Sequence, residues 1–247
     1  MSAPADPLRL VALDHVDARL APAPRAFSAE ERVAIDAHFA ARLAANPALW
    51  NGRVLLLAEH RFEGRTLTAR YGESDYASLL WLLAQEGAHP RIRASFAMGA
   101  LRGADGGFVL IRMAAWTANA GRIYFAAGTP DLSDVAADGR VDLEGSVLRE
   151  IGEETGIAAG ELTLAPGWTA IHDTRRVALM REVRIGEEAG AVAARLRRFA
   201  AGEVRPEFDE VLVVRGPQDI RAEMPPLVRL YLAKAWEEGW GQATLGP

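Results

Sequence analysis

Short apolar runs alternate with amphipathic segments along most of this chain, and this order constrains the fold more than any other feature. Runs such as 108–113 and 208–214 have the length and apolar content of buried strands, whereas 187–201 and 224–238 show the spacing of amphipathic helices. These strands and helices do not follow a simple βαβ period. We therefore predict an α/β fold in which a mixed β-sheet lies between helical layers.

The start of the chain predicts an arm followed by a helix. Residues 1–26 are rich in Ala and Pro, which is typical of an extended arm. Ser28 with Glu31 three positions later is a capping-box pattern, in which each side chain binds the other residue's backbone N–H, so a helix begins here. Asn46 and the proline after it end this helix.

Two further strands are expected over 53–58 and 66–71, joined by a hairpin. With the preceding helix they make an N-terminal α/β extension, which we assign to residues 1–92. The main domain then covers 93–247. Within it, the apolar stretch 162–173 is expected to form one strand.

A helix is expected over 76–85, and another after Asp142, whose carboxylate can accept hydrogen bonds from the free amides of the first turn. Gly156 ends it, because glycine tolerates the left-handed conformation of a helix C-terminus. At 100° per residue, Val147, Leu148 and Ile151 fall on one side of the helix. This side is predicted to be buried.

Three carboxylates, those of Glu150, Glu153 and Glu154, share an arc of the same helix. Like charges at this spacing repel one another, and Arg149, which can pair with Glu153, cannot neutralise three acids. A hard divalent cation can, since Mg²⁺ binds carboxylate oxygens and keeps its other positions for water and phosphate. A solvated acidic helix face is the alternative interpretation of the same pattern.

The complete segment 149–157, Arg-Glu-Ile-Gly-Glu-Glu-Thr-Gly-Ile, resembles the second half of the Nudix box, R-E-U-x-E-E-x-G-U, where U is a bulky aliphatic residue. Every fixed position is filled. The first half, G-x5-E-x7, is not matched, because its glycine and glutamate would fall on Val135 and Val141. The strand and glycine turn over 122–131 are similar to those that precede the box, which implies that the box glycine corresponds to Gly128 or to a residue beside it.

The resemblance implies a Nudix fold and a Mg²⁺- or Mn²⁺-dependent pyrophosphohydrolase that cleaves a nucleoside diphosphate linked to another moiety. The segment 49–52, Leu-Trp-Asn-Gly, is similar to the subgroup that contains UDP-glucose pyrophosphatases, which favours a UDP-sugar. An ADP-ribose or coenzyme A type Nudix pyrophosphatase is an alternative. A catalytically inactive Nudix-fold module for ligand binding or regulation would be a different class. Its box acids would be eroded, whereas all three are present here.

The resemblance implies a further acid from outside the box, and Glu207 and Glu210 lie where the chain enters the strand after the 187–201 helix, a suitable place for it. A polar strand edge is the alternative interpretation. Arg112 and Arg122 lie on strands before the box and can contact phosphate or a base, with exposed strand arginines as the alternative. The resemblance also implies catalytic roles for Glu153 and Arg149. The predicted metal ligands are Glu150, Glu153, Glu154, the backbone of Gly128 and Glu210, and the predicted substrate-binding residues are Arg112 and Arg122.

Composition excludes several other functions. The chain of 247 residues has no cysteine, so disulfides, thiolate metal sites and a cysteine nucleophile are absent. Its net charge of −5 provides no global field for nucleic acid or an anionic membrane. The five histidines lack zinc-site spacing. We expect a cytoplasmic protein with a nucleoside diphosphate derivative as substrate, no stable nucleic-acid or membrane partner, and a homodimer left open.

Overall fold

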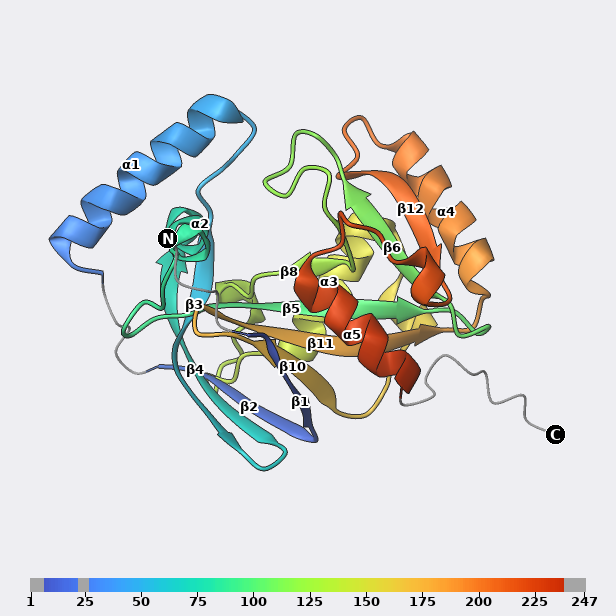
Figure 1. Cartoon of the computed structure of the whole chain (residues 1–247), viewed down its shortest axis with the longest axis horizontal. Coiled ribbons are helices and arrows are strands. Elements are labelled where there is room, and N and C mark those ends of the chain that lie inside the picture. The colour runs from blue at the N-terminus through green and yellow to red at the C-terminus, as the bar shows by residue number, and fades with distance from the viewer. Residues whose placement is uncertain (1–6, 22–26, 238–247) are drawn as a thin grey trace. The chain divides into compact units, whose positions relative to one another are not determined.

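The computed structural model describes residues 7–21 and 27–237 (Figure 1). The strands are β1 Arg9–Leu13, β2 His15–Leu20, β3 Arg53–Glu63, β4 Thr66–Asp75, β5 Ala94–Arg102, β6 Phe108–Met113, β7 Ile123–Tyr124, β8 Ala127–Gly128, β9 Leu162–Leu164, β10 Trp168–His172, β11 Arg176–Ile185 and β12 Phe208–Val214. The α-helices are α1 Ala29–Ala45, α2 Tyr76–Ala84, α3 Leu143–Thr155, α4 Ala189–Gly202 and α5 Pro226–Glu237. Short 3-10 helices cover Leu132–Asp134, Ala159–Glu161 and Pro217–Asp219. None of the helices within the described ranges combines the length and apolar composition needed to cross a membrane.

The chain forms two compact units whose segments alternate along the sequence. Unit 1 comprises Met1–Ala97, Thr129–Ser146 and Gly167–Leu179, and unit 2 comprises Met98–Gly128, Val147–Pro166 and Met180–Pro247. The elements β5, α3 and β11 each begin in unit 1 and end in unit 2. The boundary between residues 92 and 93 that we expected from the sequence stays a prediction.

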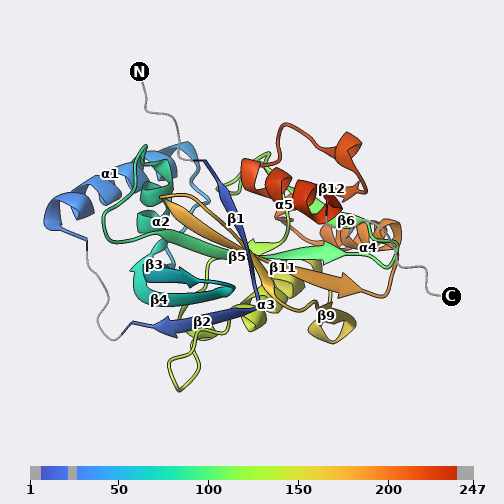
Figure 2. The ribbon, with the colours of Figure 1, turned by 60° about the horizontal axis from the view of Figure 1, so that its bottom comes forward.

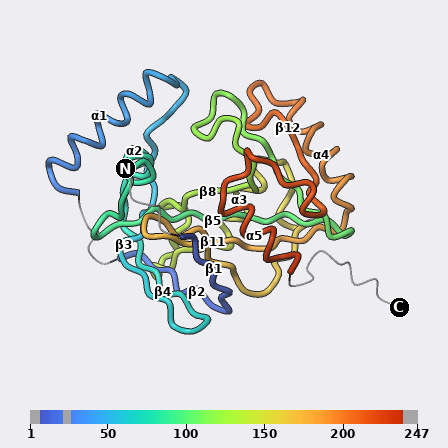
Figure 3. Tube along the Cα trace, viewed as in Figure 1, coloured from blue at the N-terminus to red at the C-terminus, as the bar shows by residue number. Residues whose placement is uncertain are grey.

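Unit 1 contains a mixed three-stranded sheet of order β2-β4-β3, in which β2 runs parallel to β4 and β3 runs antiparallel to it. Strands β3 and β4 run side by side as a hairpin (Figure 3). The hairpin turns at Gly64, which has a φ of +56°. The other N-terminal strand, β1, pairs antiparallel with β10. The expectation of an arm over 1–26 is therefore wrong for 9–13 and 15–20, while 1–6 and 22–26 lie outside the described residues. These strands pair with partners distant in sequence, which local composition does not reveal.

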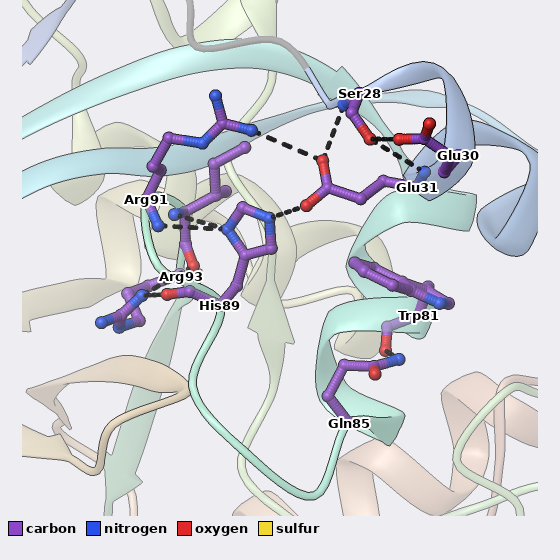
Figure 4. Close-up of polar contacts among 9 residues, drawn as sticks. Ser28, Glu30, Glu31, Trp81, Gln85, His89, Arg91 and Arg93 are labelled. Atoms are coloured by element: carbon purple, nitrogen blue, oxygen red, sulfur yellow. Dashed lines mark hydrogen bonds and ion pairs between the residues drawn. The ribbon is translucent and has the colours of Figure 1, made fainter.

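Helix α1 begins as the capping box predicts and is anchored by a buried histidine (Figure 4). The Ser28 backbone N–H donates to Glu31 Oε2 at 2.6 Å, and the Glu31 N–H donates to Ser28 Oγ at 3.2 Å. His89 Nδ1 accepts the N–H groups of Arg91 and Ile92 at 3.2 and 3.0 Å. Its Nε2 therefore carries the proton and donates to Glu31 Oε1 at 2.8 Å. The α1 N-terminus is thus tied to the loop after α2.

Unit 2 is built on strands in the order β11-β5-β6-β12. Its portion of α3 and the helix α5 lie on opposite faces of this sheet (Figures 1 and 2). Gly99 on β5 lets α3 approach, since a Cβ there would lie 2.5 Å from Ile151 Cδ1. On the α5 side, Tyr231 makes edge contacts with Phe108 and Phe125 at ring-centroid distances of 6.1 and 5.7 Å. The predicted α/β class and the mixed sheet are confirmed.

One strand predicted from the sequence is divided in two. The stretch 162–173 forms β9 and β10, separated at Gly167, whose φ is +74°. A Cβ on Gly167 would lie 2.6 Å from the carbonyl oxygen of Leu13, so this turn requires glycine. The C-terminal helix follows the prediction, although Glu238, its expected last residue, lies outside the described residues.

Candidate active site

Helix α3 presents the acidic segment as the sequence predicts. Asp142 Oδ1 accepts the N–H of Gly145 at 3.3 Å, and Gly156 follows the helix with a φ of +72°. Val147 and Ile151 are fully buried, and Leu148 is half-buried. The apolar side of α3 is therefore fixed in the core of unit 2, and this fixes the direction of the glutamates on its other side.

The three glutamates of α3 converge on one pocket but differ in exposure. Glu154 is 8 % exposed, the Glu150 side chain is 17 % exposed, and the Glu153 side chain is 62 % exposed. Arg149 Nη1 contacts Glu150 Oε1 at 2.9 Å and Glu153 Oε2 at 3.2 Å. One guanidinium thus lies between the carboxylates of Glu150 and Glu153.

The remaining wall of the pocket comes from the end of α4 and the loop that leads into β12. It encloses a cavity of about 210 Å³. The lining residues are Glu150, Glu153, Glu154, Phe199, Ala200, Glu203, Arg205, Pro206, Glu207 and Phe208, all of them in unit 2. Five carboxylates therefore face a space large enough for a diphosphate group.

Glu154 is the most perturbed group of the pocket. Burial raises its pKa well above the ordinary value, and the charges of Glu150, Glu207 and Glu153 raise it further. A hydrogen bond from the backbone N–H of Ala127 acts in the opposite direction. Its Oε2 is buried and has no hydrogen-bond partner among the described residues. A buried carboxylate oxygen without a partner is costly, so this atom is arranged for a ligand or a proton.

Glu207 is the other pocket acid with a shifted pKa. Although the residue is exposed overall, partial desolvation of its carboxylate in the pocket raises the pKa, and the charge of Glu153 adds to the effect. Of the two acids that we considered near the start of β12, the structure brings this one to the pocket. It couples to α3 although it lies more than fifty positions away in the sequence.

Strand β8 borders the carboxylates on the side of the glycine turn. A Cβ on Gly128 would collide with Cδ and Oε1 of Glu150, so the Glu150 carboxylate can hold its present position only against a glycine. The neighbouring residue Ala127 supplies the hydrogen bond to Glu154. The backbone of Gly128 therefore lies beside the glutamates, where the sequence places it.

These residues fit a hard divalent cation. Among the described residues, no group of three His, Asp or Glu side chains is arranged to hold a metal ion as it stands. The pocket nevertheless offers carboxylate oxygens only, with one buried oxygen unpartnered and the acids repelling one another. Mg²⁺ and Mn²⁺ prefer oxygen ligands of this kind, and binding would relieve the repulsion.

The other predicted residues lie in a different arrangement. Glu210 does not line the pocket and instead contacts Arg221 Nη1 at 2.8 Å and Arg112 Nε at 3.4 Å. Arg112 Nε also donates to Asp209 Oδ1 at 2.7 Å. Arg122 is exposed at the start of β7. The structure thus places Glu210 and Arg112 in an ion-pair network across β6 and β12 and does not bring them to the glutamates of α3.

A cation that we did not select from the sequence lies at the pocket. The Arg205 guanidinium carbon is 4.2 Å from the centre of the Trp116 ring, and the indole N–H of Trp116 donates to the carbonyl of Pro206 at 2.9 Å. Neighbouring residues in the sequence give no signal for this pairing. It depends on two loops that only the fold brings together.

Comparison with known proteins gives structural similarity alone. No protein-family model and no curated protein matches the chain. A Nudix hydrolase, RenU, from M. smegmatis has a TM-score of 0.40 and 17 % identity over 63 % of this chain and 89 % of its own. The MutT protein from Methanosarcina mazei Go1 has 0.40 and 19 % over 63 % and 99 %, and the pyrophosphohydrolase BsRppH from Bacillus subtilis has 0.36 and 15 % over 60 % and 84 %. At these low values the similarity does not establish function.

Proposed function

We propose that this protein is a Mg²⁺- or Mn²⁺-dependent pyrophosphohydrolase that cleaves the phosphoanhydride bond of a nucleoside diphosphate linked to another moiety. The observation that carries the proposal is the acidic pocket, where Glu154 is buried with a raised pKa and an unpartnered oxygen. The match of 149–157 to the second half of the Nudix box supports it. A solvated helix face does not account for a buried carboxylate surrounded by other acids.

The residues of the pocket divide into two roles. Glu150 and Glu154, one turn apart on α3, would hold the cation together with the backbone carbonyl of Gly128. The bound cation would offset the charge of the diphosphate and lower the pKa of a water ligand. Glu153 and Glu207 remain to take the proton from the attacking water, since both face the pocket. The raised pKa of Glu207 favours that residue as the base.

Arg149 positions the acids from the side. Because its guanidinium contacts both Glu150 and Glu153, it keeps these carboxylates apart and oriented without entering the pocket lining. In the reaction, a bond forms between the water oxygen and one phosphorus, and the P–O bond of the anhydride breaks. The electron pair of that bond leaves with the second phosphate, and the proton of water passes to a carboxylate.

The preference for a UDP-sugar rests on the resemblance of 49–52. In the structure, Asn51 Oδ1 accepts the N–H of Ala77 at 2.8 Å near the start of α2, and Trp50 is 80 % exposed. Asn51 therefore has a structural role, and its segment supports the subgroup only through sequence. UDP-glucose is our first substrate, with ADP-ribose and coenzyme A as the alternatives.

The test is a hydrolysis assay in which UDP-glucose, ADP-ribose and coenzyme A are each supplied with Mg²⁺, Mn²⁺ or EDTA. We expect two phosphorylated products by ³¹P NMR, formed only with a cation. Glu154→Gln should reduce kcat on the order of 100-fold or more. Glu144→Gln, which removes an exposed acid from the same helix, is the matched control. If the wild-type protein cleaves none of the three substrates with either cation, the proposed function is wrong.

A further inference from the structure

The pocket contains one cation among its ten lining residues, Arg205, against five glutamates. A flexible arginine in such surroundings would be expected to pair with a carboxylate. In the part of the chain that the structure describes, the guanidinium of Arg205 forms no ion pair, and its contact is the face of Trp116 at 4.2 Å. The stacking therefore holds the guanidinium away from the acids.

Trp116 is itself held in place. Its indole N–H donates to the carbonyl of Pro206, the residue next to Arg205. The loop that carries Trp116 is joined to the same segment by the N–H of Ala114, which donates to the carbonyl of Glu207 at 2.8 Å. Two hydrogen bonds thus connect the loop after β6 to the loop before β12. The ring offers a rigid surface beside the pocket.

A guanidinium that lies over an aromatic face uses its face for this contact, so its N–H groups, which point outward in its own plane, remain free to donate. Those groups match the oxygens of a phosphate in a bidentate arrangement, which an ammonium group cannot reproduce. A diphosphate substrate that enters an acidic pocket also needs positive charge besides the cation, because the glutamates repel its phosphates. Arg205 is the pocket residue that can supply this charge.

We propose that Arg205, presented by Trp116, binds a phosphate group of the substrate and sets the affinity of the pocket for diphosphates. This inference rests on the proposed function for the identity of the substrate. It assigns substrate binding to a residue pair at the pocket in place of Arg112, whose guanidinium is already held by Asp209 and Glu210.

A purely structural role for the pair predicts something different. If Arg205 and Trp116 only join the two loops, then their loss should lower the melting temperature and reduce kcat and kcat/KM together. If Arg205 binds phosphate, its loss should raise KM while Mn²⁺ binding, measured by EPR, stays unchanged. A change in KM without a change in melting temperature or Mn²⁺ binding therefore distinguishes phosphate binding from a structural role.

The experiment compares Arg205→Ala, Arg205→Lys and Trp116→Phe with the wild-type protein. The control is Arg198→Ala, which removes an exposed arginine of α4 outside the pocket lining. With the substrate that the wild-type protein cleaves best, we expect KM to rise at least tenfold in Arg205→Ala. We expect a smaller rise in Arg205→Lys, which keeps the charge and loses the planar fork, and no change in the control. Trp116→Phe keeps an aromatic face and loses the bond to Pro206, so its KM should lie between wild type and Arg205→Ala.

Binding measurements test the role of Arg205 independently of whether the protein is a pyrophosphohydrolase. Calorimetric titration with methylenediphosphonate, which is not hydrolysed, in the presence of Mn²⁺ should show at least tenfold weaker binding to Arg205→Ala. Weaker binding supports the role of Arg205 even if the wild-type protein cleaves none of the tested substrates. If wild type and Arg205→Ala bind methylenediphosphonate with equal affinity, the inference is overturned, whether or not the protein cleaves a substrate.

Discussion

Replacing Glu154 by glutamine should make the protein more stable and less active at the same time. Glutamine has nearly the shape of glutamate and keeps an oxygen for the hydrogen bond from Ala127. It removes a buried negative charge that Glu150, Glu207 and Glu153 repel, and its NH₂ group can donate toward these acids. The substitution therefore removes a cost of folding and, with it, a ligand of the cation.

The size of the effect follows from the surroundings of the side chain. Leaving one buried polar atom unsatisfied costs about 1–3 kcal/mol, and Glu154 Oε2 is such an atom. We therefore expect the free energy of unfolding to rise by about 1–3 kcal/mol in EDTA near pH 8. In a chain of this length, each kcal/mol raises the melting temperature by about 2–4 °C. Mg²⁺ at 100 times its dissociation constant stabilises the wild type by about 2.7 kcal/mol, so the difference should shrink or reverse with Mg²⁺.

The same change should alter the pH dependence. Because the pKa of Glu154 is raised in the folded state, the folded protein holds this proton more tightly than the unfolded chain does. Wild-type stability should therefore fall as the pH rises from about 4.5 through the raised pKa. The advantage of Glu154→Gln should grow over this window and vanish below it. Thermal melts at several pH values, in EDTA and in Mg²⁺, measure both effects.

The reasoning about Glu154 fails if the glutamine variant is less stable than the wild type in EDTA at pH 8. It also fails if both proteins gain the same melting temperature from Mg²⁺. Glu144→Gln, on the exposed side of α3, controls for the loss of one negative charge on this helix.

Three further predictions concern other residues. Gly128→Ala should abolish most hydrolysis, because the new methyl group displaces the Glu150 carboxylate, and should destabilise the fold by only about 0.5–1.5 kcal/mol, the cost of an off-rotamer side chain; Gly87→Ala, which meets no atom within 4 Å, should leave kcat and the urea midpoint unchanged. Glu207→Gln should lower kcat at least tenfold in the assay above, whereas Glu210→Gln should change it less than threefold, and the reverse order would refute the assignment from the pocket. Glu31→Gln should destabilise the protein by about 1–2 kcal/mol in urea titrations at pH 7, since Ser28 and His89 donate to different oxygens of the carboxylate and glutamine keeps only one of these as an acceptor. Hydrogen bonds from Ser28 and His89 lower the pKa of Glu31, so this difference should be present above pH 4.5 and disappear as the pH falls through the lowered pKa.

Local patterns in the sequence predicted the elements whose limits are set by neighbouring residues. The Ser28 and Glu31 box opens α1, and Asp142 and Gly156 delimit α3, because capping depends on side chains within three positions. Local patterns did not predict strands whose pairing partners are distant in the sequence. β2 and β4 are parallel neighbours, and nothing local marks His15 as the partner of Thr66.

The candidate site was predictable from the sequence where it depends on neighbouring residues, and not where it depends on distant ones. The helix period brings the three box glutamates together, and Gly128 lies beside them as the glycine turn suggests. The choice between Glu207 and Glu210 depends on where the chain enters β12. A bulge between Phe208 and Glu210 sets this register, and the sequence does not show it. Arg205 could not be found at all without Trp116, which precedes it by almost ninety positions.

The buried imidazole of His89 has a practical consequence for the study of motion in unit 1. Both of its nitrogens are engaged, one by two backbone amides and the other by Glu31. An acylating reagent such as diethyl pyrocarbonate can therefore react with the ring only when the loop over 89–92 opens or when the start of α1 detaches. The rate at which mass spectrometry detects carbethoxylated His89 would report how often these contacts open, without an engineered probe.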